Sequence, residues 1–264
     1  MRGGSVEVTP PSRTTTPEQA AALTHAISAD RLNTYLRLTD RDVERATALY
    51  IWNRDLSLAI LADIAIVEVA LRNALHMQLS ATWGERWYAD PSLRFDRRSA
   101  DELKRAWNHL PDNCKRSPGR DATEPGKLVA HCMMGFWVNL LDRGDYIGDP
   151  PRRVRADYED LWRITLSKAF PGGRAEARRS STTYTRNWTH SVALQVRDLR
   201  NRIAHHESLV NGFPLPGQGR RLSAMQGHEE VLRLARMLDR DLEGWLKANT
   251  SVPELLARRP AVLR

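Results

Sequence analysis

Cysteine is scarce in this chain of 264 residues, which contains only Cys114 and Cys132. Two cysteines without a Cys-x-x-Cys spacing argue against a disulfide framework and against a zinc site. Cys132 lies in an apolar helical run, where a free thiol behaves as a small hydrophobic group. We therefore expect Cys132 to pack in the core and carry no chemistry.

Long apolar runs and glycine-rich phosphate loops are also lacking. No stretch approaches the roughly 18 apolar residues of a membrane span, and the N-terminal residues lack the apolar core of a signal peptide. Gly172-Gly173 follows a proline and fits neither the Walker nor the dinucleotide-binding pattern. The sequence thus predicts a cytoplasmic protein without a membrane partner.

Lysine is rare, although the chain is basic. Lys and Arg together number 40, but only five of these residues are lysine, and the formal net charge is +8. A basic protein can attract an anionic partner such as a nucleic acid. Because so strong an arginine bias can also reflect coding composition, the charge permits nucleic-acid binding and does not establish it.

The alternating pattern of a β-strand is missing, and helical periodicity dominates. Residues 1–16 are expected to form a disordered arm, and Thr16-Pro17 has the cap and first-turn proline of a helix start. Residues 17–264 are expected to form a single all-α domain, with a C-terminal helical extension from about residue 214. Residues 56–70 are apolar nearly all round, which predicts a helix buried in a bundle. A second apolar helix is expected over residues 127–141.

The most informative segment is Leu199-Arg200-Asn201-Arg202-Ile203-Ala204-His205-His206-Glu207. It ends a predicted helix whose core-facing stripe is Val192, Val196, Leu199 and Ile203. Arginine grips a phosphate through a planar fork of donors, and histidine moves protons near neutral pH. The alternative is that these charges only complement the negative end of the helix as a solvated rim.

The spacing within this segment decides which side chains share a face. Residues four apart lie about 40° from one another, so Asn201 and His205 share a face, as do Arg202 and His206. Arg200 and His205 are five apart and diverge by about 140°. These two side chains can converge at a frayed helix end or across the two-fold axis of a homodimer, and we expect the dimer.

Glu68 is a carboxylate inside the apolar run Ile64-Ala65-Ile66-Val67-Glu68-Val69-Ala70-Leu71. A buried carboxylate must be paired or face a polar cleft. Glu68 can pair with Arg72 on the same helix, or it can orient the active-site arginine. His205-His206-Glu207 lacks the spacing of a metal site, so no metal or other cofactor is expected.

Three segments in order resemble the Abi-like proteins (AbiD/AbiF type, abortive infection) of the HEPN superfamily of helical ribonucleases. The segments are residues 199–207, residues 49–53 with 67–74, and residues 126–130 with 135–138. The resemblance implies a HEPN-like helical bundle, with Arg200 and His205 at the two defining positions and Asn201 as their polar partner. Residues expected to support them are Glu68, Arg72, Asn73, Arg202 and His206.

The resemblance implies a metal-independent endoribonuclease that acts as an antiphage defence or toxin effector. The 2′-OH of the ribose attacks the adjacent phosphorus, which restricts cleavage to RNA. Expected partners are RNA, a second copy of the chain, and an antitoxin or a phage-derived trigger. The alternatives are a non-catalytic RNA-binding module and a protein-interaction module of the same fold.

Overall fold

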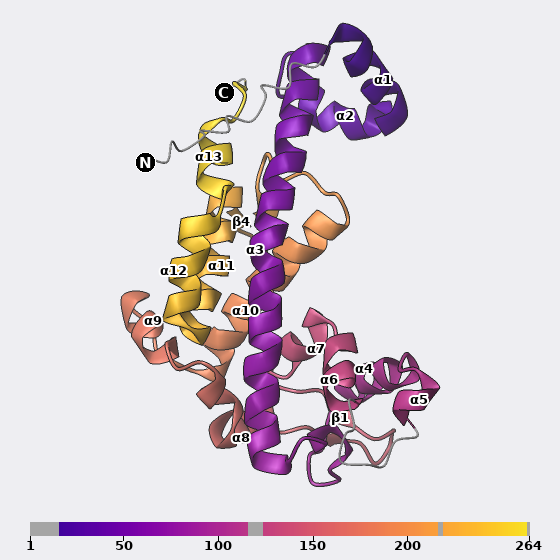
Figure 1. Ribbon diagram of the computed structural model, residues 1–264, viewed down its shortest axis with the longest axis vertical. Coiled ribbons are helices and arrows are strands. Elements are labelled where there is room, and N and C mark those ends of the chain that lie inside the picture. Colours follow the sequence, from indigo (N-terminus) through magenta and orange to yellow (C-terminus); the bar gives the residue numbers. More distant parts are fainter. Residues whose placement is uncertain (1–15, 116–123, 216–218, 263–264) are drawn as a thin grey trace, which may run out of the picture. The chain divides into compact units, whose positions relative to one another are not determined.

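The structure is a computed structural model that describes residues 16–115, 124–215 and 219–262. Helices make up 68% of the described residues and strands 3%, so the predicted all-α class is confirmed (Figure 1). The expected disordered arm, residues 1–16, lies outside the described residues except for Thr16. That threonine caps the first helix, because its side chain accepts a hydrogen bond from the backbone of Gln19 at 3.3 Å.

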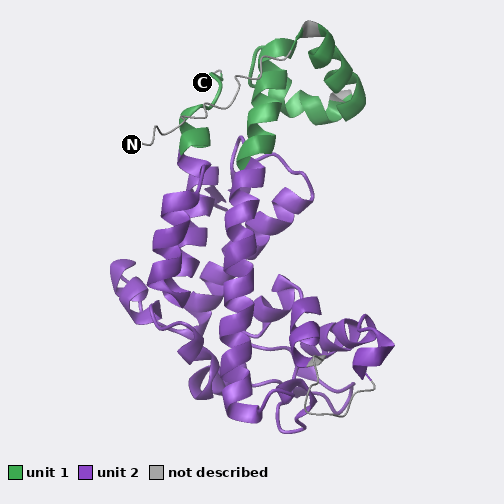
Figure 2. Cartoon of the chain, in the orientation of Figure 1, with its two compact units in different colours: residues 1–56, 254–264 green, residues 57–253 purple. Residues whose placement is uncertain are grey.

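The chain divides into two compact units, which Figure 2 shows in different colours. The first unit consists of residues 1–56 and 254–264, and the second consists of residues 57–253. The sequence predicts one domain over residues 17–264 and does not predict the division between these two units. The first unit holds α1 (Pro17–Ile27), α2 (Ala29–Leu36), the beginning of α3 (Val43–Trp83) and most of α13 (Val252–Ala257).

The second unit holds the remaining elements. They are, in chain order, the rest of α3, η1 (Trp87–Ala89), α4 (Arg97–Asn108), α5 (Asp112–Lys115), α6 (Glu124–His131), α7 (Met134–Asn139), β1 (Tyr146–Ile147), β2 (Val154–Arg155), α8 (Tyr158–Ile164), η2 (Leu166–Ala169), α9 (Gly173–Arg179), α10 (Arg186–Ala204), β3 (Phe213–Pro214), β4 (Arg221–Leu222), α11 (Ala224–Leu238) and α12 (Arg240–Asn249). The strands form two antiparallel pairs, β1 with β2 and β3 with β4.

The first unit is closed by contacts between the beginning of α3 and the C-terminal segment. The indole N–H of Trp52 donates a hydrogen bond to the backbone oxygen of Leu255 at 2.6 Å. The guanidinium of Arg45 donates to the backbone oxygen of Ala261 at 3.3 Å. These contacts join segments that are more than 200 residues apart in the chain.

Helix α3 is continuous and has one buried and one exposed face. Within the second unit, the buried face repeats every three or four residues and is fully inaccessible at Ile60, Ile64, Val67, Leu71, Leu75 and Leu79. The opposite face is exposed at Leu58, Ala62, Ala65, Val69 and Met77. The prediction of a helix buried on all sides is therefore wrong, because the apolar residues of one face have no cover within the described chain. No helix of the described ranges combines the length and the apolar character that a membrane crossing requires.

The predicted apolar helix over residues 127–141 is two helices in the structure. Helix α6 ends at His131 and α7 begins at Met134, with Met133 in an extended conformation between them. Cys132 is buried beside this break, as expected, and its burial raises the pKa of its thiol to about 12. A thiol that stays protonated is a packing group and not a nucleophile.

The motif helix α10 is packed as predicted, with Val192, Val196, Leu199 and Ile203 all buried. Helix α11 crosses it closely at Gly227, where a β-carbon would lie 2.9 Å from the side chain of Leu199. The absence of a side chain at Gly227 thus permits the approach. Helix α11, the first helix of the predicted C-terminal extension, is buried along Val231, Leu234 and Met237 and so contributes to the core of the second unit.

A buried polar contact ties α3 to the segment after α12. One carboxylate oxygen of Asp63, Oδ2, accepts hydrogen bonds from Nε2 of His228 at 2.8 Å and from the hydroxyl of Thr250 at 2.6 Å. Asp63 is 7% exposed and His228 is 5% exposed. Because groups so deeply buried exchange few hydrogen bonds with water, each depends on the other for its partner.

We expect Asp63→Ala to lower the free energy of unfolding by about 3 kcal/mol, since it leaves a buried imidazole N–H and a hydroxyl without an acceptor. Thr250→Val removes one donor and is expected to cost about 1 kcal/mol. Urea denaturation monitored by circular dichroism measures both changes. Thr250→Ser keeps the hydroxyl and serves as the control. Equal costs for Asp63→Ala and Thr250→Val would contradict the shared-acceptor arrangement.

Candidate functional site

The C-terminus of α10 places the two histidines of the motif. The backbone N–H of His206 bonds to the oxygen of Ile203 at 2.9 Å, and the N–H of Glu207 bonds to the oxygen of Arg202 at 2.9 Å. His206 has a φ of 56°. This pair of bonds around a left-handed residue is the Schellman arrangement, which usually has glycine at that position. His205 is the last residue before the reversal, and its side chain is exposed.

Arg200 lies one turn and a half before His205 and faces α3. Its Nε is 3.7 Å from Oε2 of Glu68, which forms an ion pair without a direct hydrogen bond. The two side chains are 28% and 24% exposed. Of the two predictions for Glu68, pairing with Arg72 and pairing with the motif arginine, the structure has the second. Both groups keep some access to solvent, so Glu68 can hold the guanidinium without burying it.

The other motif residues lie around this pair. The backbone oxygen of Asn201 accepts a hydrogen bond from the N–H of His205 at 2.9 Å, and its side chain is half-buried. Arg202 forms an ion pair with Glu207 across the helix end. That contact fixes the direction in which the chain leaves α10. Arg202 therefore has a structural partner at the helix end.

Among the described residues, no hydrogen bond or ion pair joins Arg72 or Asn73 to the motif. Asn73 is exposed on α3. Arg72 is half-buried, and its Nε is buried without a hydrogen-bond partner among the described residues. Arg72 is close enough to Cys132 to influence that thiol electrostatically. The predicted site residues are therefore brought together only in part, with Arg200 and Glu68 at the centre.

A charged cluster around Arg98, at the start of α4, is absent from the sequence-based prediction. The guanidinium of Arg98 bonds to Asp96 at 2.8 Å and to Asp142 at 2.9 Å. Asp96 is fully buried and also accepts from the backbone of Ser99 and Asp145. These bonds, opposed by burial, hold the pKa of Asp96 below its ordinary value.

His190 belongs to the same region. Burial lowers the pKa of His190, although Asp142 opposes this effect. His190 precedes Arg200 by ten residues, which is about 15 Å along a helix. The cluster is thus a separate group of polar residues in the second unit and is not part of the site around Arg200. Its members are distributed between residues 96 and 190, so no spacing rule can find it.

Glu102 on α4 is close enough to Arg98 and Asp96 of this cluster to interact with them electrostatically. Burial raises the pKa of Glu102, while Arg105, Arg197 and Arg98 oppose the effect electrostatically. Arg197 itself bonds to Asp198 at 3.2 Å on α10. A half-buried carboxyl group with a raised pKa can exchange protons closer to neutral pH than an exposed one. The sequence gives no signal for Glu102, which reads as an ordinary charge on an amphipathic helix.

His76 on α3 is held in its neutral form by a tryptophan. The indole N–H of Trp87, which can only donate, points at Nδ1 of His76 at 3.0 Å. Nδ1 must therefore be unprotonated for this bond to form. Burial lowers the pKa of His76, with Glu85 opposing the effect.

The lowered pKa values of His76 and His190 predict that stability falls as the pH falls below about 6.5. The unfolded chain takes up protons at that pH while the folded chain resists them, so the unfolded state binds more protons. His76→Asn retains an acceptor for Trp87 but does not titrate. Its unfolding free energy is expected to change less between pH 7.5 and 5.5, by at most about 1.4 kcal/mol per pH unit. Chemical denaturation at both pH values measures how the unfolding free energy depends on pH. If this dependence were the same in His76→Asn and in the unmodified protein, His76 would not contribute to it.

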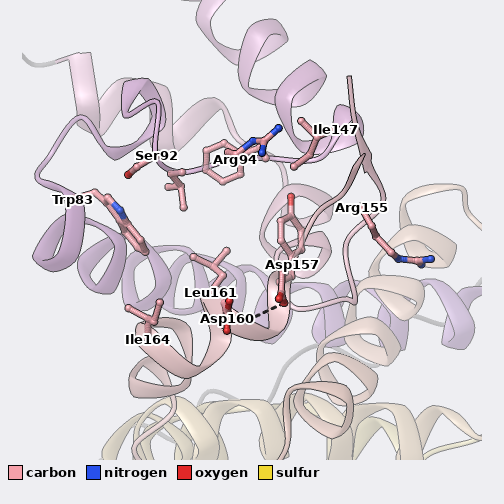
Figure 3. A pocket seen from close by; sticks show the side chains of 12 residues that line it. Trp83, Ser92, Arg94, Ile147, Arg155, Asp157, Asp160, Leu161 and Ile164 are labelled. Atoms are coloured by element: carbon pink, nitrogen blue, oxygen red, sulfur yellow. Dashed lines mark hydrogen bonds between the residues drawn. The ribbon is translucent and has the colours of Figure 1, made fainter. Parts of the chain in front are cut away.

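A cavity of about 270 Å³ lies between the end of α3 and α8. Figure 3 shows Trp83, Leu161 and Ile164 on its apolar side and Arg155 pointing away from it. Its two carboxylates already have partners, since Asp157 caps α8 and Asp160 pairs with Arg163. None of the motif residues lines this cavity, so it is separate from the candidate site.

Comparisons with protein families, with curated proteins and with solved structures find no match to this chain. The candidate site is therefore defined by the chain's own geometry. It consists of the Arg200–Glu68 pair and the exposed His205 at the end of α10.

Proposed function

We propose that this protein is a metal-independent endoribonuclease with a HEPN-like helical bundle, acting in antiphage defence or as a toxin. The observation that supports it best is the pairing of Arg200 with Glu68 at the end of a buried helix that terminates in an exposed histidine. An arginine held by a partly solvated carboxylate is oriented and still able to receive a phosphate. The net charge of +8 favours a polyanionic substrate.

The proposed reaction is the intramolecular displacement that RNA permits. A base removes the proton of the ribose 2′-OH and the 2′-oxygen bonds to the adjacent phosphorus. The bond from phosphorus to the 5′-oxygen of the next nucleotide breaks, and an acid gives that oxygen a proton. His205 is the candidate for moving one of these protons. Arg200 stabilises the charge that develops on the phosphoryl oxygens. Asn201 orients the histidine or the phosphate, and Glu68 positions Arg200.

The active form is proposed to be a two-fold homodimer that uses the exposed face of α3. Leu58, Ala62, Ala65 and Val69 are spaced by four, three and four residues, which is the seam spacing of paired helices. This face borders Glu68. Pairing it with its own copy brings the two Glu68–Arg200 pairs to one seam and covers apolar side chains that the single chain leaves exposed.

Products with 2′,3′-cyclic phosphate or 3′-phosphate ends are expected when the purified protein is incubated with total RNA. EDTA is expected to leave the rate unchanged, since side chains supply every group of the proposed reaction. End-labelling before and after phosphatase treatment identifies the ends. Products with 5′-phosphate ends that form only with Mg²⁺ would refute this mechanism. Binding of RNA without any new ends would instead favour the non-catalytic RNA-binding module.

A further inference from the structure

A second cavity of the second unit has the composition of a ligand site. It measures about 470 Å³ and lies where η1, α4 and α6 meet; its lining residues include Tyr88, Phe95, Leu103, Lys104 and Trp107. Helices α4 and α6 lie side by side there (Figure 1). Small-molecule sites in proteins usually have volumes of about 300–1,000 Å³. This cavity is thus large enough for a ligand the size of a nucleotide.

Aromatic side chains line the cavity, and the buried Trp87 packs against two of them. The rings of Tyr88 and Trp107 are 6.4 Å apart and inclined at 46°. Trp87, which is fully buried, contacts Tyr88 at 5.6 Å and Phe95 at 5.9 Å between ring centroids. Because Trp87 fixes two of the walls, a planar ligand meets surfaces that need little reordering.

Helix α4 supplies the floor and one of two cations. Ala100, Leu103, Lys104 and Trp107 share one face, as their spacing of three, one and three residues requires. The small side chain of Ala100 leaves room between the aromatic walls. Lys104 is exposed and forms no ion pair within the described ranges.

The charges of the lining have one sign. Arg86 and Lys104 are the charged residues of the lining, which includes no carboxylate from the part of the chain that the structure describes. The acidic neighbours on α4 are directed elsewhere, since Asp101 lies 3.9 Å from Arg97 and Glu102 faces Gly135 on α7. The described lining of the cavity therefore combines stacking surfaces with positive charge.

We propose that this cavity binds a nucleotide, with the base against Tyr88 and Trp107 and the phosphate at Lys104 and Arg86. Bases stack on aromatic side chains without regard to sequence, and a cation beside the stack selects the phosphorylated form over the neutral nucleoside. The nucleotide belongs to an RNA strand or is free in solution. The proposal requires no cleavage and stands whether or not the protein is a ribonuclease.

Isothermal titration of the full-length protein with AMP, CMP, GMP, UMP and adenosine, in EDTA, tests the site. A nucleoside monophosphate is expected to bind at least about tenfold more tightly than adenosine. Lys104→Ala is expected to remove about tenfold of the affinity for the monophosphate and to leave adenosine unchanged. Trp107→Ala is expected to weaken both by roughly tenfold or more, and Trp107→Phe to restore them.

Lys168→Ala, an exposed lysine on η2, is the matched control and is expected to change nothing. Competition by a single-stranded RNA against the monophosphate, measured on the His205→Ala variant, distinguishes the sources. Competition identifies a strand of RNA as the ligand, and its absence identifies a free nucleotide. The proposal is overturned if no nucleotide binds at millimolar concentration, or if binding is indifferent to both Lys104 and Trp107. Both readouts are independent of cleavage, so failure of the ribonuclease proposal does not obscure them.

Discussion

His205→Ala is expected to lower the rate of RNA cleavage by about 10²- to 10⁴-fold, the range for removal of a general acid or base. The side chain is exposed at the last position before α10 reverses, so it can reach a bound strand. Its removal leaves the buried stripe of α10 intact. RNA affinity is therefore expected to remain nearly unchanged, because Arg200 and the basic surface still attract phosphate.

The measurement is a single-turnover cleavage assay together with an equilibrium binding assay on the same RNA. His25→Ala provides the matched control, since His25 is also an exposed histidine in the last turn of a helix but belongs to the first unit. Its cleavage rate is expected to equal that of the unmodified protein. If His205→Ala cleaved at the normal rate, the catalytic role of His205 would be wrong. If the variant lost RNA binding in parallel with cleavage, the result would favour the non-catalytic RNA-binding module.

The local features of the motif helix could be predicted from sequence. A stripe of apolar residues at steps of four, three and four fixes which face of α10 is buried, and the structure buries all four residues. The helix start at Thr16 follows from the capping preference of threonine. Both properties depend on neighbours within two turns, so the sequence contains all the information that determines them.

Pairings between distant segments could not be predicted in the same way. A carboxylate within an apolar run indicates that some partner exists, and α3 contains two such carboxylates, Asp63 and Glu68. The partners, His228 with Thr250 for one and Arg200 for the other, are more than 100 residues away. The local choice, Arg72, is sterically possible on one helix. Only the packing of α10 and α11 against α3 decides against it.

The exposed face of α3 illustrates a second limit. Hydropathy shows that residues 56–70 are apolar nearly all round, and this pattern is typical both of a helix buried within one chain and of a helix at an interface between chains. The structure shows that one face, from Leu58 to Val69, is open.

The break between α6 and α7 is a third feature that the sequence does not predict, because neither Cys132 nor Met133 is a proline or a glycine, the residues that usually mark the end of a helix.

Mixing Arg200→Ala and His205→Ala subunits is expected to restore about a quarter of the cleavage rate, although each variant alone is inactive. Arg200 and His205 diverge on α10, and Glu68 draws the guanidinium toward α3. A site composed across the two-fold axis takes Arg200 from one chain and His205 from the other. Half of the dimers in an equal mixture are mixed, and each of these holds one intact site out of two.

The exchange is made by unfolding and refolding the two variants together, and the mixture is compared with each variant refolded alone. Val69→Asp, which places a charge on the exposed face of α3, is expected to prevent both dimer formation and the recovery, because burying an unpaired carboxylate at the seam is costly. Size-exclusion chromatography with light scattering reports the assembly. A monomer that cleaves RNA at the full rate would refute the dimeric site. A mixed dimer without recovered activity would mean that one chain supplies both Arg200 and His205 to each site.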